Sequence, residues 1–219
     1  RDVAPSRGLG DVYKRQISSN RPKIVVIGSC NTDMVVKANR LPVPGETILG
    51  GTFYMNPGGK GANQAIAAAR LGAEVTFISK IGYDLFGLQA LEIYRSEKIN
   101  TEFIFTDQKS PSGVALISVD SFGENSIIVA PGASRSLSTE DINKAEEKIK
   151  EADIILMQLE VPIDTVEYAA TIANRYGKKV ILNPAPASTL SNSFLNNVHT
   201  ILPNRCLLYT SDAADDRIS

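Results

Sequence analysis

The sequence predicts an α/β fold in which a parallel central sheet is flanked by helices and carries a small antiparallel β layer at one edge. Short runs of branched apolar residues alternate with amphipathic segments of helix length, and two pairs of extended segments interrupt that alternation. Strand–helix repeats of this kind favour parallel strands with right-handed crossovers. The interrupting pairs contain turn residues and favour hairpins set apart from the main sheet.

The first half of the chain alternates buried strands with one β excursion. KIVVIGS, residues 23–29, is a continuous apolar run that predicts a buried parallel strand. Residues 33–56 hold two extended pieces around a Pro-Gly turn, which predict an antiparallel pair. From Gly61 the pattern is helical and ends at Leu71–Gly72, where glycine is a typical C-terminal signal. AEVTFISKIG, residues 73–82, predicts the next buried strand.

The second half begins with a helix that Asp84 can cap and that runs to about Glu97. SGVALISVD and ENSIIVA, within residues 112–130, are joined by SFG and form the clearest hairpin signal in the chain. We place this hairpin with residues 33–56 in one small β layer. Ser138 and Asp141 form an approximate capping box before an amphipathic helix. A strand, a helix and two further strands are then predicted at 153–160, 161–177, 178–186 and 199–204.

The composition is that of a folded domain without nucleic-acid or membrane partners. Of the 219 residues 43% are hydrophobic, and the formal net charge is −1. A chain of this length buries a sizeable core, and its charge gives no electrostatic footprint for nucleic acid or an anionic membrane. No apolar run reaches the ~20 residues that span a bilayer, and we see no leader-like segment at the start.

The cysteines favour a reducing compartment. Cys30 and Cys206 are the only two in the sequence, so they build no disulfide framework. We therefore expect a cytoplasmic location. Cys30 follows the first predicted strand, and we interpret it as a small packed residue rather than a nucleophile.

Both ends of the chain are predicted to be foreign to the protein, with native termini as the alternative. DNA that can encode DVYKRQ, residues 11–16, has a reverse complement that encodes CLLYTS, residues 206–211, in a shifted frame. Such an inverted repeat is typical of a translated sequencing adapter, and segments of this kind are excluded from fold reasoning. We interpret 1–16 and 205–219 as adapter-derived and 17–204 as a truncated, N-terminal part of a longer domain.

The glycine-rich stretch PGGKGANQAIAAARLG, residues 57–72, fits neither common nucleotide-binding motif. A Walker-type phosphate loop needs Ser or Thr after Gly-Lys, but Gly61 follows Gly59 and Lys60 here. The dinucleotide fingerprint would need a third glycine at the position of Gln64. The stretch is therefore predicted to bind a ligand other than a nucleotide, or to bind no ligand.

The same stretch suits a polyhydroxy ligand. Gly58, Gly59 and Gly61 allow a ligand to approach the backbone amides at the helix start. Lys60 and Asn63 share one face of the first turn and add an ammonium and a carboxamide group. The alternative is a tight turn with Lys60 in solvent.

Polar residues also follow the predicted parallel strands, at the edge where open α/β sheets bind ligands. Asn31 and Asp33 come after the first strand and point the same way in an extended chain. A carboxylate accepts hydrogen bonds from two adjacent hydroxyls, which suits a sugar diol, whereas a turn cap is the alternative for Asp33. Glu160 follows a later strand and is either a solvated strand end or, near a phosphate, a carboxylate that organises a metal through water. Asn183 and Asn204 are either site residues or turn residues.

On these motifs the chain resembles the ribokinase family of sugar kinases, also called the PfkB family, from about residue 23 to 204. The resemblance implies a Rossmann-like ribokinase fold whose β layer is a lid that closes over the sugar and forms a homodimer contact. The combination of NxD with GGKGANQA favours ribose over fructose or nucleoside substrates. The matching segments are IGSCNTDMV, LPVPGET, NPGGKGANQAIAAARLGAEV, SPSGVALISVD, LMQLE, LNPAPA and LPN.

The resemblance also implies roles for individual residues. Asn204 lies where the family has an asparagine near the ATP phosphates, and Glu160 would organise Mg²⁺ through water. Arg205 stands where the family has glutamate after that asparagine. The residues implied to contact or organise ribose are Asn31, Asp33, Gly58, Gly59, Lys60, Asn63 and Glu160.

The implied reaction is ATP-dependent phosphorylation of the 5-hydroxyl of D-ribose, with Mg²⁺ and a monovalent cation, K⁺. The family's catalytic base lies in a Gly-Ala-Gly-Asp segment that this sequence does not contain. We therefore assign no catalytic residue and expect the chain as given to be inactive. The alternatives are another sugar or nucleoside kinase of the same family and a non-catalytic sugar-binding protein.

Overall fold

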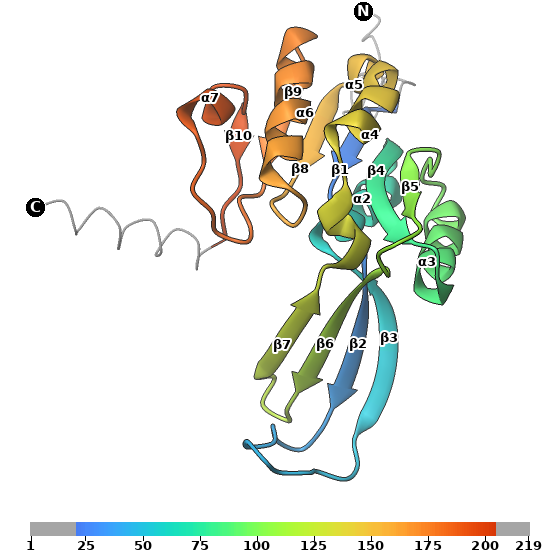
Figure 1. The fold of residues 1–219 in the computed structure, drawn as a ribbon, viewed down its shortest axis with the longest axis vertical. Helices are drawn as coiled ribbons and strands as arrows, with labels where there is room; N and C mark the ends of the chain where they lie inside the picture. Colours follow the sequence, from blue (N-terminus) through green and yellow to red (C-terminus); the bar gives the residue numbers. More distant parts are fainter. Residues whose placement is uncertain (1–20, 205–219) are drawn as a thin grey trace, which may run out of the picture.

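The computed structural model describes residues 21–204, in which a parallel sheet with helices on both faces adjoins a second, projecting sheet (Figure 1). This arrangement confirms the predicted fold class. The terminal segments interpreted as adapter-derived, 1–16 and 205–219, lie outside the described residues. The six strands of the parallel sheet are, in spatial order, β10 (Thr200–Ile201), β9 (Lys179–Leu182), β8 (Ile154–Met157), β1 (Lys23–Ile27), β4 (Glu74–Gly82) and β5 (Ile104–Asp107).

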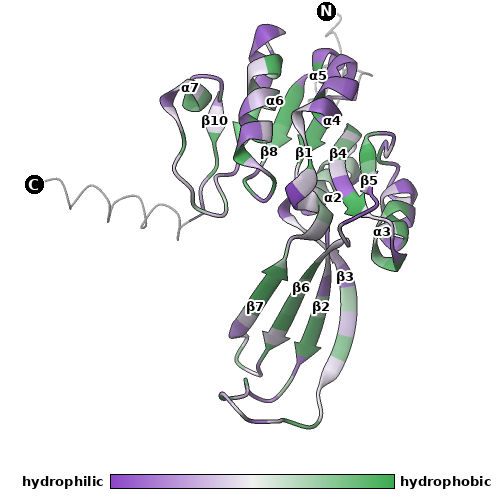
Figure 2. Ribbon diagram, in the orientation of Figure 1, coloured by the Kyte–Doolittle hydropathy of each residue, from purple (hydrophilic) through white to green (hydrophobic). Residues whose placement is uncertain are grey.

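The second sheet, which we call the lid, is built from two segments that are far apart in the sequence. β2 is antiparallel to β3 and β6 is antiparallel to β7, while β2 runs parallel to β6 with Asn31 opposite Gly113. The two predicted antiparallel pairs therefore join into one sheet, and Figure 2 shows hydrophobic residues along several of its strands. In spatial order the lid strands are β3 (Thr52–Gly58), β2 (Asn31–Lys37), β6 (Gly113–Val119) and β7 (Asn125–Ala130).

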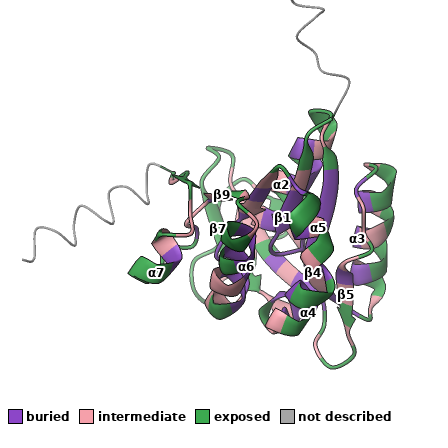
Figure 3. Ribbon diagram, turned by 90° about the horizontal axis from the view of Figure 1, so that it is seen from above, coloured by how far each residue is buried: buried purple, intermediate pink, exposed green. Residues whose placement is uncertain are grey.

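Strand alternation divides the core of the main sheet into two layers. Val25 and Ile27 of β1 pack in one apolar cluster with α4, α5 and α6, whereas Val26 packs in the other with α2 and α3. Figure 3 shows the buried residues along the central strands and the inner faces of these helices. The helices are α2 (Lys60–Arg70), α3 (Leu85–Ser96), the 3₁₀-helix η1 (Gly132–Ser136), α4 (Thr139–Lys144), α5 (Glu146–Glu151), α6 (Ile163–Arg175) and α7 (Asn192–Leu195).

The helix predicted after Ser138 is two helices instead of one. The capping box of Ser138 and Asp141 is present, but the helix breaks at Ala145, whose N–H bonds to the carbonyl of Ile142 three residues earlier. This tighter turn lets Ile142, Ala145 and Ile149 all lie fully buried against the core. A regular 3.6-residue period predicts the buried face but not such a break.

Two strands also differ from the sequence-based expectation. β5 was not predicted, and the last expected strand, 199–204, is reduced to Thr200 and Ile201. Both strands lie at the edges of the parallel sheet, where pairing on one side only gives a weaker sequence pattern. Within residues 21–204 no helix is long and apolar enough to cross a membrane.

Candidate functional site

The candidate site forms where the chain passes from the parallel sheet into the lid and where α2 begins. Residues 28–30 connect β1 to β2, and the N-terminus of α2 packs directly on them, with Ala62 N–H donating to the Ser29 carbonyl at 2.9 Å. A Cβ at Gly61 would lie only 2.6 Å from the carbonyl carbon of Gly28. Gly59, with φ +89°, has a backbone conformation that favours glycine. The glycines therefore allow the β1–β2 connection and the start of α2 to pack closely together.

Glu160, just past β8, is held by the start of α2. Its Oε1 accepts from Lys60 Nζ at 2.5 Å, and its Oε2 accepts from Lys60 N–H at 2.9 Å and from the Ser29 hydroxyl at 2.5 Å. Burial raises the pKa of this carboxyl, but the hydrogen bonds from Lys60 and Ser29 outweigh it, so the pKa is lowered below its ordinary value. The carboxylate is thus ionised and fixed in orientation.

Asp33 is the third residue of β2, is half-buried, and lies near this ion pair. A Cβ at Gly58 would come within 1.9 Å of Asp33 Oδ1, so the carboxylate lies against the Gly58 backbone. Burial and the charge of Glu160 raise the pKa of Asp33, while Lys60 opposes the rise. The three side chains therefore share one electrostatic environment, formed by two carboxylates with an ammonium group near both.

Asn31 is the one predicted ligand residue among 21–204 whose side chain is buried. It is 5% exposed, shares a lid face with Asp33, and lies against β6, where a Cβ at Gly113 would be 2.1 Å from its Oδ1. That Oδ1 has no hydrogen-bond partner among the described residues. Asn63 is exposed on the first turn of α2, and its N–H donates to the Gly59 carbonyl.

The structure gathers most of the predicted site residues at one place and leaves others apart from it. Asn183 follows β9 and lines a hollow of about 450 Å³ together with Gln64 and Ile181. Asn204 follows β10 at the sheet edge, separated from β8 by β9. The residues gathered around the α2 N-terminus are Asn31, Asp33, Gly58, Gly59, Lys60 and Glu160, with Asn63 on the same helix.

Sequence reasoning missed Ser29 and Gln158. The Ser29 hydroxyl donates to Glu160 and accepts from Gly61 N–H at 3.4 Å, so it joins three of the segments that meet at the site. Gln158 is fully buried and donates from Nε2 to Gln64 Oε1 at 2.5 Å. A small hydroxyl residue after a strand-ending glycine is a weak signal, because its partner lies 131 positions later in the chain.

The described residues supply few metal ligands. Across 21–204 no group of three or more His, Cys, Asp or Glu side chains is placed to hold a metal ion. Both oxygens of Glu160 already accept hydrogen bonds from Lys60 or Ser29. This carboxylate is therefore not a free ligand, and a metal could use it only through water.

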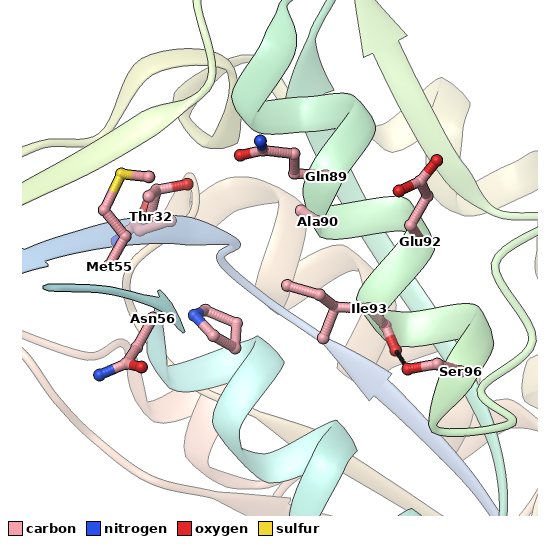
Figure 4. Close-up of a pocket in the computed structure, with 10 residues that line it drawn as sticks. Thr32, Met55, Asn56, Gln89, Ala90, Glu92, Ile93 and Ser96 are labelled. Atoms are coloured by element: carbon pink, nitrogen blue, oxygen red, sulfur yellow. Dashed lines mark hydrogen bonds between the residues drawn. The ribbon is translucent and has the colours of Figure 1, made fainter.

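A cavity of about 430 Å³ lies next to the site but is distinct from the Lys60–Glu160 pair. It is lined by lid residues such as Thr32, Met55 and Asn56 on one side and by α3 residues such as Gln89 and Ile93 on the other (Figure 4). Of the predicted ligand residues only Asn31 borders it. The cavity is therefore the space between lid and α3.

The chain belongs to the pfkB family of carbohydrate kinases, because the family model described as "pfkB family carbohydrate kinase" matches residues 21–206. Ribokinases are prominent among its relatives. It is 45% identical to the ribokinase of Haemophilus influenzae over 84% of this chain and 60% of that protein, and 44% identical to the ribokinase of Mus musculus over 75% and 51%. The chain thus spans about 60% or less of the length of these relatives.

The fold of the chain is also similar to that of solved structures. "Structure of Arabidopsis thaliana Ribokinase complexed with Ribose and ATP" superposes with a TM-score of 0.75 at 31% identity, over 86% of this chain and 62% of that chain. "Crystal Structure of Sa239" superposes with a TM-score of 0.82 at 38% identity, over 87% and 63%. The fold and family predicted from sequence are therefore confirmed.

Proposed function

We propose that this chain carries the sugar-binding part of a ribokinase-type kinase and binds D-ribose at the junction of β2, β8 and α2. The observation that carries the proposal is the shared electrostatic environment of Asp33, Lys60 and Glu160 beside the bare backbone of Gly58 and Gly59. Two carboxylates near an ammonium group suit a neutral ligand with many hydroxyls, because hydroxyls both donate to carboxylates and accept from ammonium.

Each side chain has a role that follows from its chemistry. The Asp33 carboxylate accepts from two adjacent sugar hydroxyls, and the desolvation that raises its pKa makes such charge-assisted bonds strong. Lys60 and Asn63 donate from the first turn of α2, and Gly58 and Gly59 admit the sugar close to the backbone. Glu160 fixes the Lys60 ammonium, and Asn31 fills the buried end of the site.

The reaction proposed for the whole enzyme is transfer of the γ-phosphoryl group of ATP to the 5-hydroxyl of ribose. Solved structures of the ribokinases of Arabidopsis thaliana and Cryptococcus neoformans are complexes with ATP and ADP, respectively, which supports nucleotide use. When bound, Mg²⁺ would neutralise charge on the phosphates. The described residues form no metal cluster, so we propose that Mg²⁺ comes with the nucleotide, that K⁺ activates, and that the base lies in a segment outside this sequence. Asn204 remains our proposed contact to the phosphates.

The lid supports a further proposal about assembly. Large apolar residues lie exposed on both of its faces, which is unusual for a monomer surface. We propose that two copies of the intact enzyme pair through their lids in the cytoplasm. The exposed residues are Val36, Phe53, Tyr54, Met55, Leu116, Ile127, Ile128 and Val129.

A second candidate substrate is 2-deoxyribose. Deoxyribokinases of Salmonella typhi and Salmonella typhimurium are each 40% identical to this chain over 83% of it. A site that bonds the 2-hydroxyl should reject the deoxy sugar, because the half-buried Asp33 carboxylate would lose a partner. Comparing ribose with 2-deoxyribose therefore tests whether that hydroxyl is held.

Isothermal titration calorimetry on the chain tests the proposal directly. Ribose is expected to bind more tightly than 2-deoxyribose, fructose and adenosine, and the Asp33→Asn variant is expected to lose most of that affinity. Asp164→Asn, on the first turn of α6, is the matched control and should bind as the parent does. A preference for adenosine would overturn the ribose assignment. Formation of ribose 5-phosphate by this chain alone would contradict the placement of the base outside it.

A further inference from the structure

Asp84 of the main domain holds the lid through hydrogen bonds to Ser112, the residue just before β6. This carboxylate accepts from Ser112 N–H through Oδ2 at 2.7 Å, and from the Ser112 hydroxyl and Gly87 N–H through Oδ1 at 2.7 and 2.9 Å. The Ser112 hydroxyl in turn accepts from Gly82 N–H at 3.0 Å. Ser112 is thereby joined to the end of β4 and to the start of α3.

Close packing leaves little room for the backbone around Ser112 to move. A Cβ at Gly82 would lie 2.4 Å from Ser112 N, and one at Gly87 would lie 2.8 Å from the Ser112 hydroxyl. A Cβ at Gly132, which follows β7, would lie 2.3 Å from the Pro111 carbonyl oxygen. The segment before β6 is therefore enclosed by backbone on several sides, and Asp84 supplies the hydrogen bonds that orient it.

The Asp84–Ser112 contact connects directly to the candidate site. Ser112 is followed by Gly113, the first residue of β6, which pairs with Asn31 and lies against its side chain. The same β2–β6 pairing places Asp33 opposite Ala115. A displacement of Ser112 would therefore shift the two lid residues that face the proposed sugar.

We propose that Asp84 is a positioning residue for sugar binding, which sets the place of Asn31 and Asp33 by holding Ser112. The effect on sugar binding rests on the proposed function. The claim that Asp84 holds the lid in place does not depend on it. Asp84 also caps α3 through Gly87, so its two tasks, capping and holding the lid, have to be separated by experiment.

The variant Asp84→Ser separates them. Serine is as good an N-cap as aspartate and keeps the bond to Gly87 N–H, but it has a single oxygen and loses the two bonds to Ser112. Ser112→Ala removes the hydroxyl from the other side. The matched control is Glu97→Ser at the opposite end of α3, where the carboxylate accepts hydrogen bonds from Arg70 of α2 instead of from the lid.

Two measurements on the full chain test the proposal: amide hydrogen exchange of β2 and β6, and ribose affinity by calorimetry. Asp84→Ser is expected to speed exchange across both strands and to weaken ribose binding roughly 3- to 30-fold, with the α3 amides unchanged. Combining it with Ser112→Ala should cost less than the sum of the two single changes, because both remove the bond between the Ser112 hydroxyl and Asp84, although Ser112→Ala also removes the bond from Gly82 N–H. Glu97→Ser should leave lid exchange and ribose affinity as in the parent.

Unchanged lid exchange in Asp84→Ser overturns the inference whatever the sugar result. Faster lid exchange with parental ribose affinity also overturns it, because Asp84 would then hold the lid without positioning the site. A parent chain that binds no ribose contradicts the proposed function instead, and the exchange pattern alone then decides whether Asp84 holds the lid. Faster exchange in α3 itself would show that the cap was lost. Lid exchange and ribose affinity in Ser112→Ala, which leaves the cap intact, then decide whether the inference stands.

Discussion

Glu160 caps helix α2 from a distance of 100 positions in the sequence, through the N–H of Lys60 at 2.9 Å. The helix has no side-chain cap of its own and no acidic residue in its first turn. Its first N–H, that of Lys60, and its partial positive charge are instead met by this carboxylate, while the N–H groups of Gly61 and Ala62 donate to Ser29. Lys60 also supplies the ammonium group that pairs with Glu160. The same carboxylate therefore caps the helix and forms the ion pair.

We expect Glu160→Gln to destabilise the fold by about 1–3 kcal/mol at pH 7, because it leaves Lys60 without its charged partner and weakens the cap. The lowered pKa of Glu160 fixes the pH dependence. Its contribution is full above the unfolded-state pKa and is lost as pH falls through the folded-state pKa. Urea unfolding should show the parent and variant converging at acid pH. Glu97→Gln, which breaks an exposed pair with Arg70, is the control; an equal loss there would contradict a special role for Glu160.

Asp33→Asn should separate stability from binding. The raised pKa means that the folded state disfavours the charged carboxyl, so stability falls as pH rises between the unfolded and folded pKa values and stays lower above them. The neutral amide is therefore expected to leave stability at pH 7 unchanged or higher while ribose binding weakens about 10- to 100-fold, as for loss of a charged hydrogen bond. Thermal unfolding and calorimetry on the same samples give both quantities. A variant that is less stable yet binds ribose normally would refute this assignment.

Gly58→Ala is expected to harm the fold only while Asp33 keeps its carboxylate. The new methyl would lie 1.9 Å from Asp33 Oδ1 and displace it. In an Asp33→Ala background the obstacle is gone, so the double variant should recover about 1–3 kcal/mol relative to the sum of the single changes. Gly45→Ala, which meets nothing within 4 Å at φ +83°, measures backbone strain alone. Additive free energies of unfolding would show that the two residues do not touch.

Cys30 should be inert to thiol reagents in the native state. Burial raises its pKa to about 11, and its sulfur lies 2.9 Å from the Tyr94 hydroxyl in the core. At pH 8 the thiol is therefore neutral and covered. In a Cys206→Ser chain, labelling by Ellman's reagent is expected to follow the rate of unfolding and to accelerate with urea. Rapid labelling without denaturant would mean that the β1–β2 connection opens.

Strands and helix starts that depend on local sequence patterns were predicted well. The apolar runs placed β1, β4 and β8, and the glycine-rich turn placed the start of α2. The sequence could not reveal bonds between distant segments, such as those of Ser29 with Glu160 or Asp84 with Ser112. It left Glu160 as either a solvated strand end or a carboxylate that organises a metal through water, because an ion pair with Lys60 leaves no trace in either local sequence.

The parallel pairing of β2 with β6 has a consequence for how the polypeptide is made. Residues 31–37 are synthesised long before residues 113–119, and until the latter emerge, one edge of the β2–β3 hairpin stays open. Pairings across so long a stretch of chain form slowly, and an open strand edge invites wrong partners. Because β8, β9 and β10 follow β7 in the sequence, all four lid strands have emerged before the parallel sheet can be completed.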